Sequence, residues 1–390
     1  MKKKSHNFSQ INSSINSSQK ILKNDLANLK SDNLKADNVK SDNSKSDNLK
    51  SDLGQKFSIA NIEIKAGNRK RIDIDMGSIY DFTEVKMPIE VLRGSKNGPT
   101  IFICSTIHGD EIIGIEIVRR VLAKLDVKNL SGTVIAIPIV NVFGFNDRSR
   151  YLPDRRDLNR CFPGLKNGSL ASQLAFKFMQ EIVLKSDFGI DIHTGAYHRT
   201  NLPQIRTDIE NSQNLALAKA FNAPAIVNSN LRDGSLREAT SQAKIPMVLF
   251  EAGEALRFDE NAVEIGVNGI FGVLEEISML KKSPRILRKN IFLARSTSWI
   301  RASQSGICIP KIKLGSMVKK GQIIAEISNP FGDNKTFVKA LEDGMVIGSS
   351  ILPLVNKGDA LFHIGYEIDQ KNNAISENNL GIDTLNIKHY

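Results

Sequence analysis

The sequence predicts an α/β protein whose sheet is covered by helices on both faces, followed by a small all-β domain. Between about residues 95 and 282, segments that are apolar throughout alternate with amphipathic segments of helical period. Strands that are apolar along their whole length are typical of a sheet buried on both faces. From about 295 to 366, short apolar runs are separated by Gly-Asp and Gly-Ser turns, which is typical of a β domain.

Changes in composition divide the chain into five segments. We expect a disordered low-complexity tail over 1–55, a short β segment over 56–94 that leads into the core, an α/β domain over 95–285, a β domain over 292–366 and a polar tail over 367–390. The first prediction rests on a five-residue unit, KSDNL and its variants, repeated over 30–52. One weak apolar residue per unit cannot bury a core. A helical oligomerisation segment is the alternative, although a period of five drifts off a helical stripe.

The expected elements follow one another in a regular order. Two half-exposed strands are expected first, over 57–67 and 69–77. The apolar strands of the α/β domain are expected at 100–104, 132–141, 188–193, 223–228 and 245–251. The helices are expected at 115–125, 170–185, 211–222, 234–244 and 260–280.

Composition excludes several classes of protein. Hydrophobic residues make up 41% of the chain and charged residues 24%, as in soluble globular proteins. We expect no membrane span, because no apolar run is long enough, and no signal peptide, because no apolar segment follows the basic start MKKK. Three distant cysteines favour a reducing, cytoplasmic compartment over a disulfide framework. The net charge of +11 is dispersed and aromatic residues are only 6%, so nucleic acid is not an expected partner.

Two histidines close apolar strands of the α/β domain. His108 ends TIFICSTIH and His193 ends FGIDIH. Ligands bind at the carboxyl ends of strands in open α/β sheets, so these two side chains can converge. Glu111 lies three residues after His108 in a turn that enters a helix, which points both side chains the same way. Two histidines and one carboxylate with an open fourth position form the pattern of catalytic zinc.

We therefore predict that His108, Glu111 and His193 bind one Zn²⁺ per chain. Asp191 lies two residues before His193 and could accept its second ring N–H, which would fix the tautomer. The alternative is two unrelated histidines that cap separate strands. Such a ligand set also accepts other divalent ions.

The arginine-rich stretch 146–164 lies between an expected strand and an expected helix. This stretch is either a solvated loop of mixed charge or a loop that binds a carboxylate. The apolar part of DLNRCFPG favours the second interpretation, because packing on the sheet would fix Asn159 and Arg160. A guanidinium suits bidentate binding of a carboxylate. Asp157 is positioned to support an arginine or a metal ligand.

A further carboxylate, Glu251, ends the strand 245–251, and Glu254 follows in the sequence FEAGE. A carboxylate at a third strand end, beside metal-activated water, is the expected general base. We assign this role to Glu251. Glu254 is the rival, and its alternative role is that of an acid near a helix N-terminus.

HGDE, RDLNRCFPG, DIHTG and FEAGE, in this order over roughly residues 95–280, resemble the succinylglutamate desuccinylase/aspartoacylase family. That family shares one fold group with the zinc carboxypeptidases, so the resemblance implies a zinc-exopeptidase-like mixed sheet and makes 95–285 the catalytic domain. It also implies hydrolysis of an amide between an acyl group and an amino acid's nitrogen. The implied residues are the zinc ligands His108, Glu111 and His193, the catalytic Glu251, and Arg150, Asn159 and Arg160 for the substrate carboxylate or the scissile carbonyl.

The β domain has a resemblance of its own. GSMVKKGQIIAEI, ALEDGMVIG and VNKGDALFHIG are similar to the turns of a biotinyl/lipoyl-like barrel. The hairpin lysine that carries the cofactor in true carrier domains is absent, and Lys339 lies elsewhere. We therefore expect this domain to have a structural role as a lid, a rim or an assembly surface. With the strands at 57–95, this domain makes the chain similar to the predicted-deacylase branch of the family.

The function expected is therefore zinc-dependent hydrolysis of an N-acyl amino acid or related small acid. The expected partner is a small molecule that bears a carboxylate, with no nucleic acid and no membrane. A homo-oligomer is compatible with the sequence. A zinc carboxypeptidase that acts on short peptides and a degenerate, non-catalytic scaffold are the alternatives.

Overall fold

The computed structural model describes residues 56–367, so the predictions made for 1–55 and 368–390 lie outside the described residues. The strands of its α/β part are β1 (Ser58–Ile59), β2 (Ile62–Glu63), β3 (Asn68–Ser78), β4 (Glu84–Arg93), β5 (Lys96–Ser105), β6 (Ser131–Ile137), β7 (Phe188–Gly195), β8 (Arg199–Thr207), β9 (Ala225–Asn228) and β10 (Met247–Glu254). The apolar strands predicted from the sequence correspond to β5, β6, β7, β9 and β10.

The helices lie between these strands. They are α2 (Ile113–Lys124), α3 (Val142–Asn146), η1 (Leu158–Arg160), α4 (Leu170–Glu181), η2 (Val183–Lys185), α5 (Ser212–Phe221), α6 (Leu236–Gln242) and α7 (Glu260–Glu276). Several begin at a polar residue whose side chain accepts a backbone N–H of the first turn, which stabilises the helix start. These residues are Ser169, Asn211, Ser235 and Asp259.

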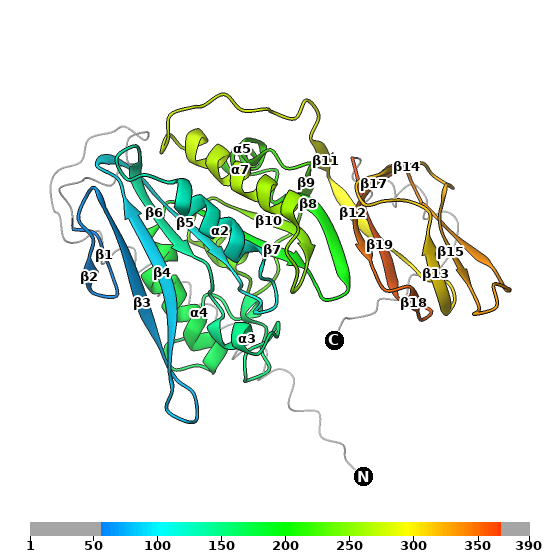
Figure 1. Ribbon diagram of the computed structural model, residues 1–390, viewed down its shortest axis with the longest axis horizontal. Coiled ribbons are helices and arrows are strands. Elements are labelled where there is room, and N and C mark those ends of the chain that lie inside the picture. The colour runs from blue at the N-terminus through cyan, green and yellow to red at the C-terminus, as the bar shows by residue number, and fades with distance from the viewer. Residues whose placement is uncertain (1–55, 368–390) are drawn as a thin grey trace, which may run out of the picture. The chain divides into compact units, whose positions relative to one another are not determined.

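A mixed sheet of 13 strands runs through the described residues (Figure 1). At its centre, β6, β5, β7 and β10 pair in parallel, so their carboxyl ends meet at one edge. The strands β3 and β4 continue the sheet antiparallel beyond β6. The mixed α/β fold predicted from the sequence is confirmed.

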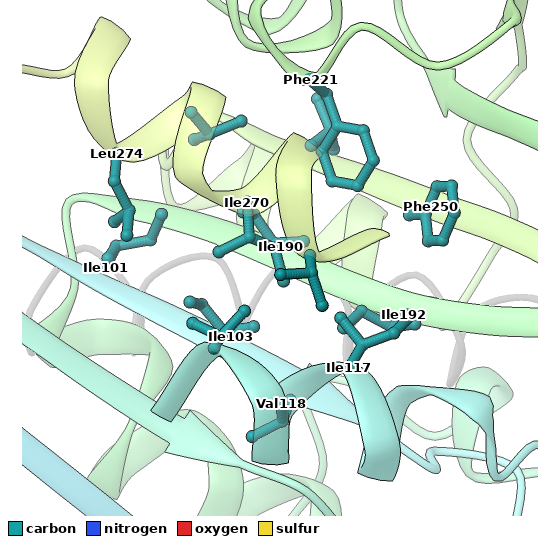
Figure 2. Packing of buried hydrophobic residues seen from close by; sticks show 14 of the residues in the cluster. Ile101, Ile103, Ile117, Val118, Ile190, Ile192, Phe221, Phe250, Ile270 and Leu274 are labelled. Carbon is teal, nitrogen blue, oxygen red and sulfur yellow. The ribbon is translucent and has the colours of Figure 1, made fainter. Parts of the chain in front are cut away.

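Helices cover the sheet on both faces. Buried residues of α2, α5 and α7 form one apolar cluster with β5, β7 and β10, whereas α4 and α6 contribute to a second cluster on the other side. Figure 2 shows the first cluster, with side chains of β5 and β7 facing those of α2 and α7. The residues labelled there are Ile101, Ile103, Ile117, Val118, Ile190, Ile192, Phe221, Phe250, Ile270 and Leu274.

The strand β8, whose sequence is RTNLPQIRT, was not expected from the sequence. A proline is atypical of a strand inside a sheet, because it cannot donate a ladder hydrogen bond. In the structure, Pro203 falls where the pairing with β10 is irregular, between Asn201 and Gln204. The backbone N–H that Pro203 lacks is therefore not needed at this irregular position. The strand was not recognised in the sequence because β8 is largely polar.

The C-terminal region is β-rich, as predicted. Its strands are β11 (Phe292–Ala294), β12 (Ser296–Arg301), β13 (Gly306–Pro310), β14 (Met317–Val318), β15 (Ile323–Ser328), β16 (Thr336–Lys339), β17 (Gly344–Ser350), β18 (Leu354–Val355) and β19 (Ala360–Tyr366). A four-stranded sheet, β16-β15-β13-β18, shares an apolar cluster with β17 and β19. Because β17 pairs antiparallel with β8, the large sheet continues from the α/β part into this region.

None of the helices in residues 56–367 combines the length and the apolar character that crossing a membrane requires.

Candidate metal centre and active site

The turn between β5 and α2 places His108 and Glu111 at the carboxyl edge of the sheet. Thr106 has a positive φ of 59°, which is unfavourable for a β-branched residue. Its Oγ1 donates to the Pro138 carbonyl at 3.1 Å, and its own carbonyl accepts from the Asn141 N–H at 2.9 Å. These bonds to the segment after β6 hold the turn in this conformation, and the Glu111 N–H closes it on the His108 carbonyl at 3.1 Å.

The three residues predicted to bind zinc come together. The ligand atoms of His108, Glu111 and His193 all lie within 4.8 Å of one another, and all three residues are buried. The Glu111 carboxylate lies between the two rings, with Oε1 at 2.7 Å from His108 Nδ1 and Oε2 at 2.6 Å from His193 Nδ1. The Thr194 N–H also donates to Glu111 Oε2, at 3.1 Å.

A second carboxylate holds the far side of each ring. His193 Nε2 lies 2.8 Å from Asp191 Oδ2, and His108 Nε2 lies 3.1 Å from Asp157 Oδ1. Both rings therefore present Nδ1 inward, and their outward nitrogens are held by acids. Such outer partners fix the tautomer and orientation of metal-binding histidines. The sequence analysis predicted this role for Asp191, and it predicted for Asp157 a supporting role without naming the ligand.

The charges of this cluster shift its pKa values strongly. Burial disfavours the ionised Glu111 carboxylate, but the adjacent His108 and His193 outweigh burial and hold the pKa of Glu111 well below its usual range. Burial likewise opposes protonation of His193, but Asp191 and Glu111 raise the pKa of its ring well above the ordinary value. The carboxylate of Glu111 and the ring of His193 therefore each favour the charged form of the other.

This donor set fits a divalent cation. Two inward imidazole nitrogens and one ionised carboxylate are the ligands of catalytic zinc sites, and the acids behind the rings are the usual outer partners. Within residues 56–367, this is the one group of three or more such side chains close enough to hold a metal ion.

Arg150 joins the cluster from the loop after α3. Its Nη1 donates to Glu111 Oε1 at 3.1 Å and its Nη2 to Asp157 Oδ2 at 2.9 Å. Burial lowers the pKa of this guanidinium, but the charges of Glu111 and Asp157 outweigh burial and raise it. Arg150 thus contacts two acids of the centre, and the role toward substrate expected from the sequence stays a prediction.

Asn159 and Arg160 lie in η1, next to Asp157. Asn159 is buried, and its Oδ1 accepts the Leu236 N–H at 2.9 Å, so η1 is fixed to the start of α6. The Asn159 N–H donates to Asp157 Oδ1 at 2.8 Å. Arg160 is exposed, and its Nη1 donates to the Asn159 carbonyl at 2.6 Å. The packing expected for this segment is therefore observed at Asn159.

Glu251 lies beside His193, one of the predicted metal ligands. Its Cα pairs with that of His193 in the parallel ladder between β10 and β7. Its Oε1 accepts a hydrogen bond of 2.7 Å from Asn201 Nδ2, and its Oε2 forms an ion pair with Arg206. Glu254 lies three residues further on, where its Oε1 accepts the His198 N–H at 3.1 Å.

Asn201 and Arg206 were not predicted from the sequence, because β8 was not recognised as a strand. The available signal was the segment PQIR at 203–206, which alternates apolar and polar side chains a short distance after the strand of His193. Assigned as a strand, it would have placed a polar face next to the active site.

Comparisons with known proteins find similar sequences and folds. Residues 97–277 match the succinylglutamate desuccinylase/aspartoacylase catalytic domain. One relative is the N-α-acetyl-L-2,4-diaminobutyric acid deacetylase of Halomonas elongata, which is 27% identical over 294 residues that span 71% of this chain and 84% of the relative.

Two solved structures share the fold. The product-bound ectoine utilization protein EutE of Ruegeria pomeroyi has a TM-score of 0.71 at 24% identity, over 79% of this chain and 98% of that one. The succinylglutamate desuccinylase/aspartoacylase of Rhodobacter sphaeroides has a TM-score of 0.69 at 23% identity, over 79% and 99% of the two chains. The match to the catalytic domain and the deacetylase relative confirm the resemblance seen in the sequence: residues 97–277 are similar to the catalytic domain of the succinylglutamate desuccinylase/aspartoacylase family, and the solved structures share the fold.

Proposed function

We propose that this protein is a zinc-dependent hydrolase that cleaves a linear amide, with an N-acyl amino acid or a related small acid as substrate. The observation that carries the proposal is the convergence of His108, Glu111 and His193 within 4.8 Å, backed by Asp157 and Asp191. The deacetylase relative, named for an acetylated diamino acid, supports this class of substrate.

His108, Glu111 and His193 would hold the ion. A zinc ion bound there supplies Lewis acidity, which polarises a carbonyl group and makes water more acidic. Asp157 and Asp191 keep the two rings oriented with Nδ1 toward the centre. Glu251, next to His193 in the ladder, takes a proton from the attacking water and delivers it to the departing nitrogen.

Arginines beside Glu251 suit a substrate that carries a carboxylate. Partial burial lowers the pKa of the Arg232 guanidinium, and the charges of Arg160 and Arg206 lower it further. Positive charge is therefore gathered closely here. In this proposal, Arg160 binds the substrate carboxylate and Asn159 holds the substrate through its side-chain amide. Arg150 adds positive charge to the same site while it neutralises Glu111 and Asp157. A carboxylate of the substrate gains charge-assisted hydrogen bonds in such surroundings.

The proposal is tested by assaying zinc-loaded protein against a panel of N-acetyl, N-succinyl and other N-acyl amino acids and short peptides. We expect release of free amino acid from at least one N-acyl amino acid, abolished by a chelator and restored by zinc. Turnover of peptides alone would indicate a carboxypeptidase. No turnover of any compound, with no zinc bound, would indicate a non-catalytic scaffold and contradict the proposal.

A further inference from the structure

Both oxygens of the Glu251 carboxylate are contacted by side chains of a single strand, β8. Asn201 Nδ2 donates to Oε1 at 2.7 Å, and Arg206 forms an ion pair with Oε2. Asn201 is only 6% exposed, so it does not exchange this contact freely with water. The orientation of Glu251 therefore depends on where β8 places Asn201.

A bulge in β8 brings Glu251 and Asn201 together, because three steps of β8, from Gln204 to Asn201, lie opposite two steps of β10. The register between β10 and β8 shifts between Glu251, which pairs with Gln204, and Gly253, which pairs with Asn201. Gly253 has a positive φ of 68°, a conformation that glycine adopts without steric cost. Bulges of this kind redirect side chains next to active sites. Here the bulge lets the Glu251 side chain reach Asn201, which lies three positions before Gln204, the ladder partner of Glu251.

The half of β8 that carries Asn201 depends on the C-terminal region for its second neighbour. Residues 204–207 of β8 pair with β9, whereas 199–201 pair with β17. Without β17, this half would be a sheet edge with unpaired backbone groups. The Gln204 side chain adds a further tie, because its Nε2 donates to the Ile347 carbonyl at 3.1 Å.

Gly348 is the residue of β17 that pairs with Asn201. A Cβ atom at this position would lie 2.6 Å from Asn201 Oδ1 and 3.2 Å from His363 Cβ. The first distance is too short for any real contact, so the Asn201 amide would have to move. The absence of a side chain at Gly348 thus leaves the space in which Asn201 reaches Glu251.

We propose that Asn201 is a positioning residue for Glu251, and that the C-terminal strand β17 secures it through Gly348. In this proposal, the C-terminal region supports catalysis by holding Asn201 in place. The inference rests on the proposed role of Glu251 as general base.

The first test replaces Asn201 by aspartate, which has the same shape but no N–H to donate and carries a like charge. We expect Asn201→Asp to lower kcat by about 100-fold, because small misplacements of a catalytic group have effects of this order. KM and the zinc content should stay near wild-type values, since neither the metal ligands nor Asn159 and Arg160 are changed. A merely structural role would lower the yield of folded protein or the zinc content instead.

The second test is a double-mutant cycle between Gly348→Ala and Asn201→Ala. Gly348→Ala should lower kcat in the wild-type background and have little further effect in the Asn201→Ala background, where no Oδ1 obstructs the new methyl group. Ser349→Ala, at the next position of β17, is the matched control and should behave as wild type. If Gly348→Ala is not recovered folded, Asn201→Asp alone decides the question.

The outcomes separate this inference from the proposed function when Glu251→Gln is assayed alongside. An inactive Glu251→Gln with fully active Asn201→Asp would overturn the positioning role and leave the general base in place. Equal losses from Gly348→Ala in both backgrounds would show that Gly348 does not act through Asn201. An active Glu251→Gln would instead refute the proposed base itself.

Discussion

At the scale of single residues, Asp191 connects the sheet core to the metal centre. It accepts from His193 Nε2 at 2.8 Å and from the Cys104 thiol at 3.4 Å, and it is fully buried. Asp191→Asn keeps the shape but removes the charge that orients His193. We expect zinc affinity to fall by about 10–100-fold with the fold intact, measured by chelator competition. Asp187→Asn, just before the same strand, is the control; equal affinities for the two variants would refute the role.

The assignment of Glu251 as the general base is tested by comparing variants of Glu251 and Glu254. Glu251→Gln should retain zinc and lose about 10²–10⁴-fold in kcat, because the amide cannot take a proton. Glu254→Gln should keep most activity, because Glu254 accepts only a backbone N–H from His198. Steady-state kinetics with matched zinc analyses decide the assignment. The reverse pattern would move the base to Glu254.

Individual site residues were predictable from the sequence where they lie at the end of an apolar strand. His108, His193 and Glu251 each end an apolar strand, so the common edge of the parallel strands could be inferred and the convergence followed. Asn201 and Arg206 could not be placed in this way. Their contact with Glu251 depends on a bulge, which has no periodic signal, and on an antiparallel strand that contains a proline and alternates only over the four residues PQIR.

At the scale of elements, α2 and α7 are joined by a chain of charges on their exposed sides. Glu116 accepts hydrogen bonds from Arg119 and Arg120, both at close range, and Arg120 also donates to Glu260 of α7 at 2.8 Å. The hydrogen bonds from Arg119 and then Arg120 lower the pKa of Glu116 to about 2, against a partial effect of burial.

This shift predicts a pH dependence of stability. Because the folded-state pKa of Glu116 lies below its unfolded value, its ionisation stabilises the fold above pH 4.5 and the effect is lost as the pH falls toward about 2. Glu116→Gln should therefore lower the urea midpoint at pH 7 and differ less from wild type at pH 3. Glu276→Gln, exposed at the end of α7, is the control. A difference that does not shrink at low pH would contradict the assignment.

Most elements of the α/β part were predictable, since apolar strands and amphipathic helices have distinct periods. The helix predicted at 260–280 ends at Glu276 in the structure, and the strands predicted at 57–67 reduce to the short pair β1 and β2. The short α3 was not predicted, because five residues contain too little periodicity.

At the scale of the molecule, the large sheet passes from the α/β part into the C-terminal region through the pairing of β8 with β17. A small apolar cluster of β9, β11 and β17 residues, Ile347 among them, is buried at this junction. The sequence predicted a β-rich region there but not this connection, because pairing between distant strands leaves no local signal.

This continuity predicts that the two parts unfold together. Trp299, the single tryptophan of the chain, lies in β12 of the C-terminal region, whereas the helices of residues 56–367 all precede it. Its fluorescence and the circular dichroism of the helices should therefore give coincident thermal transitions. Zinc should raise both midpoints equally, since it binds only the folded protein. Separate transitions, with only the helical signal shifted by zinc, would contradict this prediction.

The central claim is that His108, Glu111 and His193 together bind one catalytic metal ion. Its most direct test is the zinc content of wild-type, His193→Ala and His198→Ala protein after equilibration with zinc and dialysis. We predict about one zinc ion per chain in the wild type and in the His198→Ala control, and less than about a tenth of that in His193→Ala. Full zinc occupancy in His193→Ala would contradict the account.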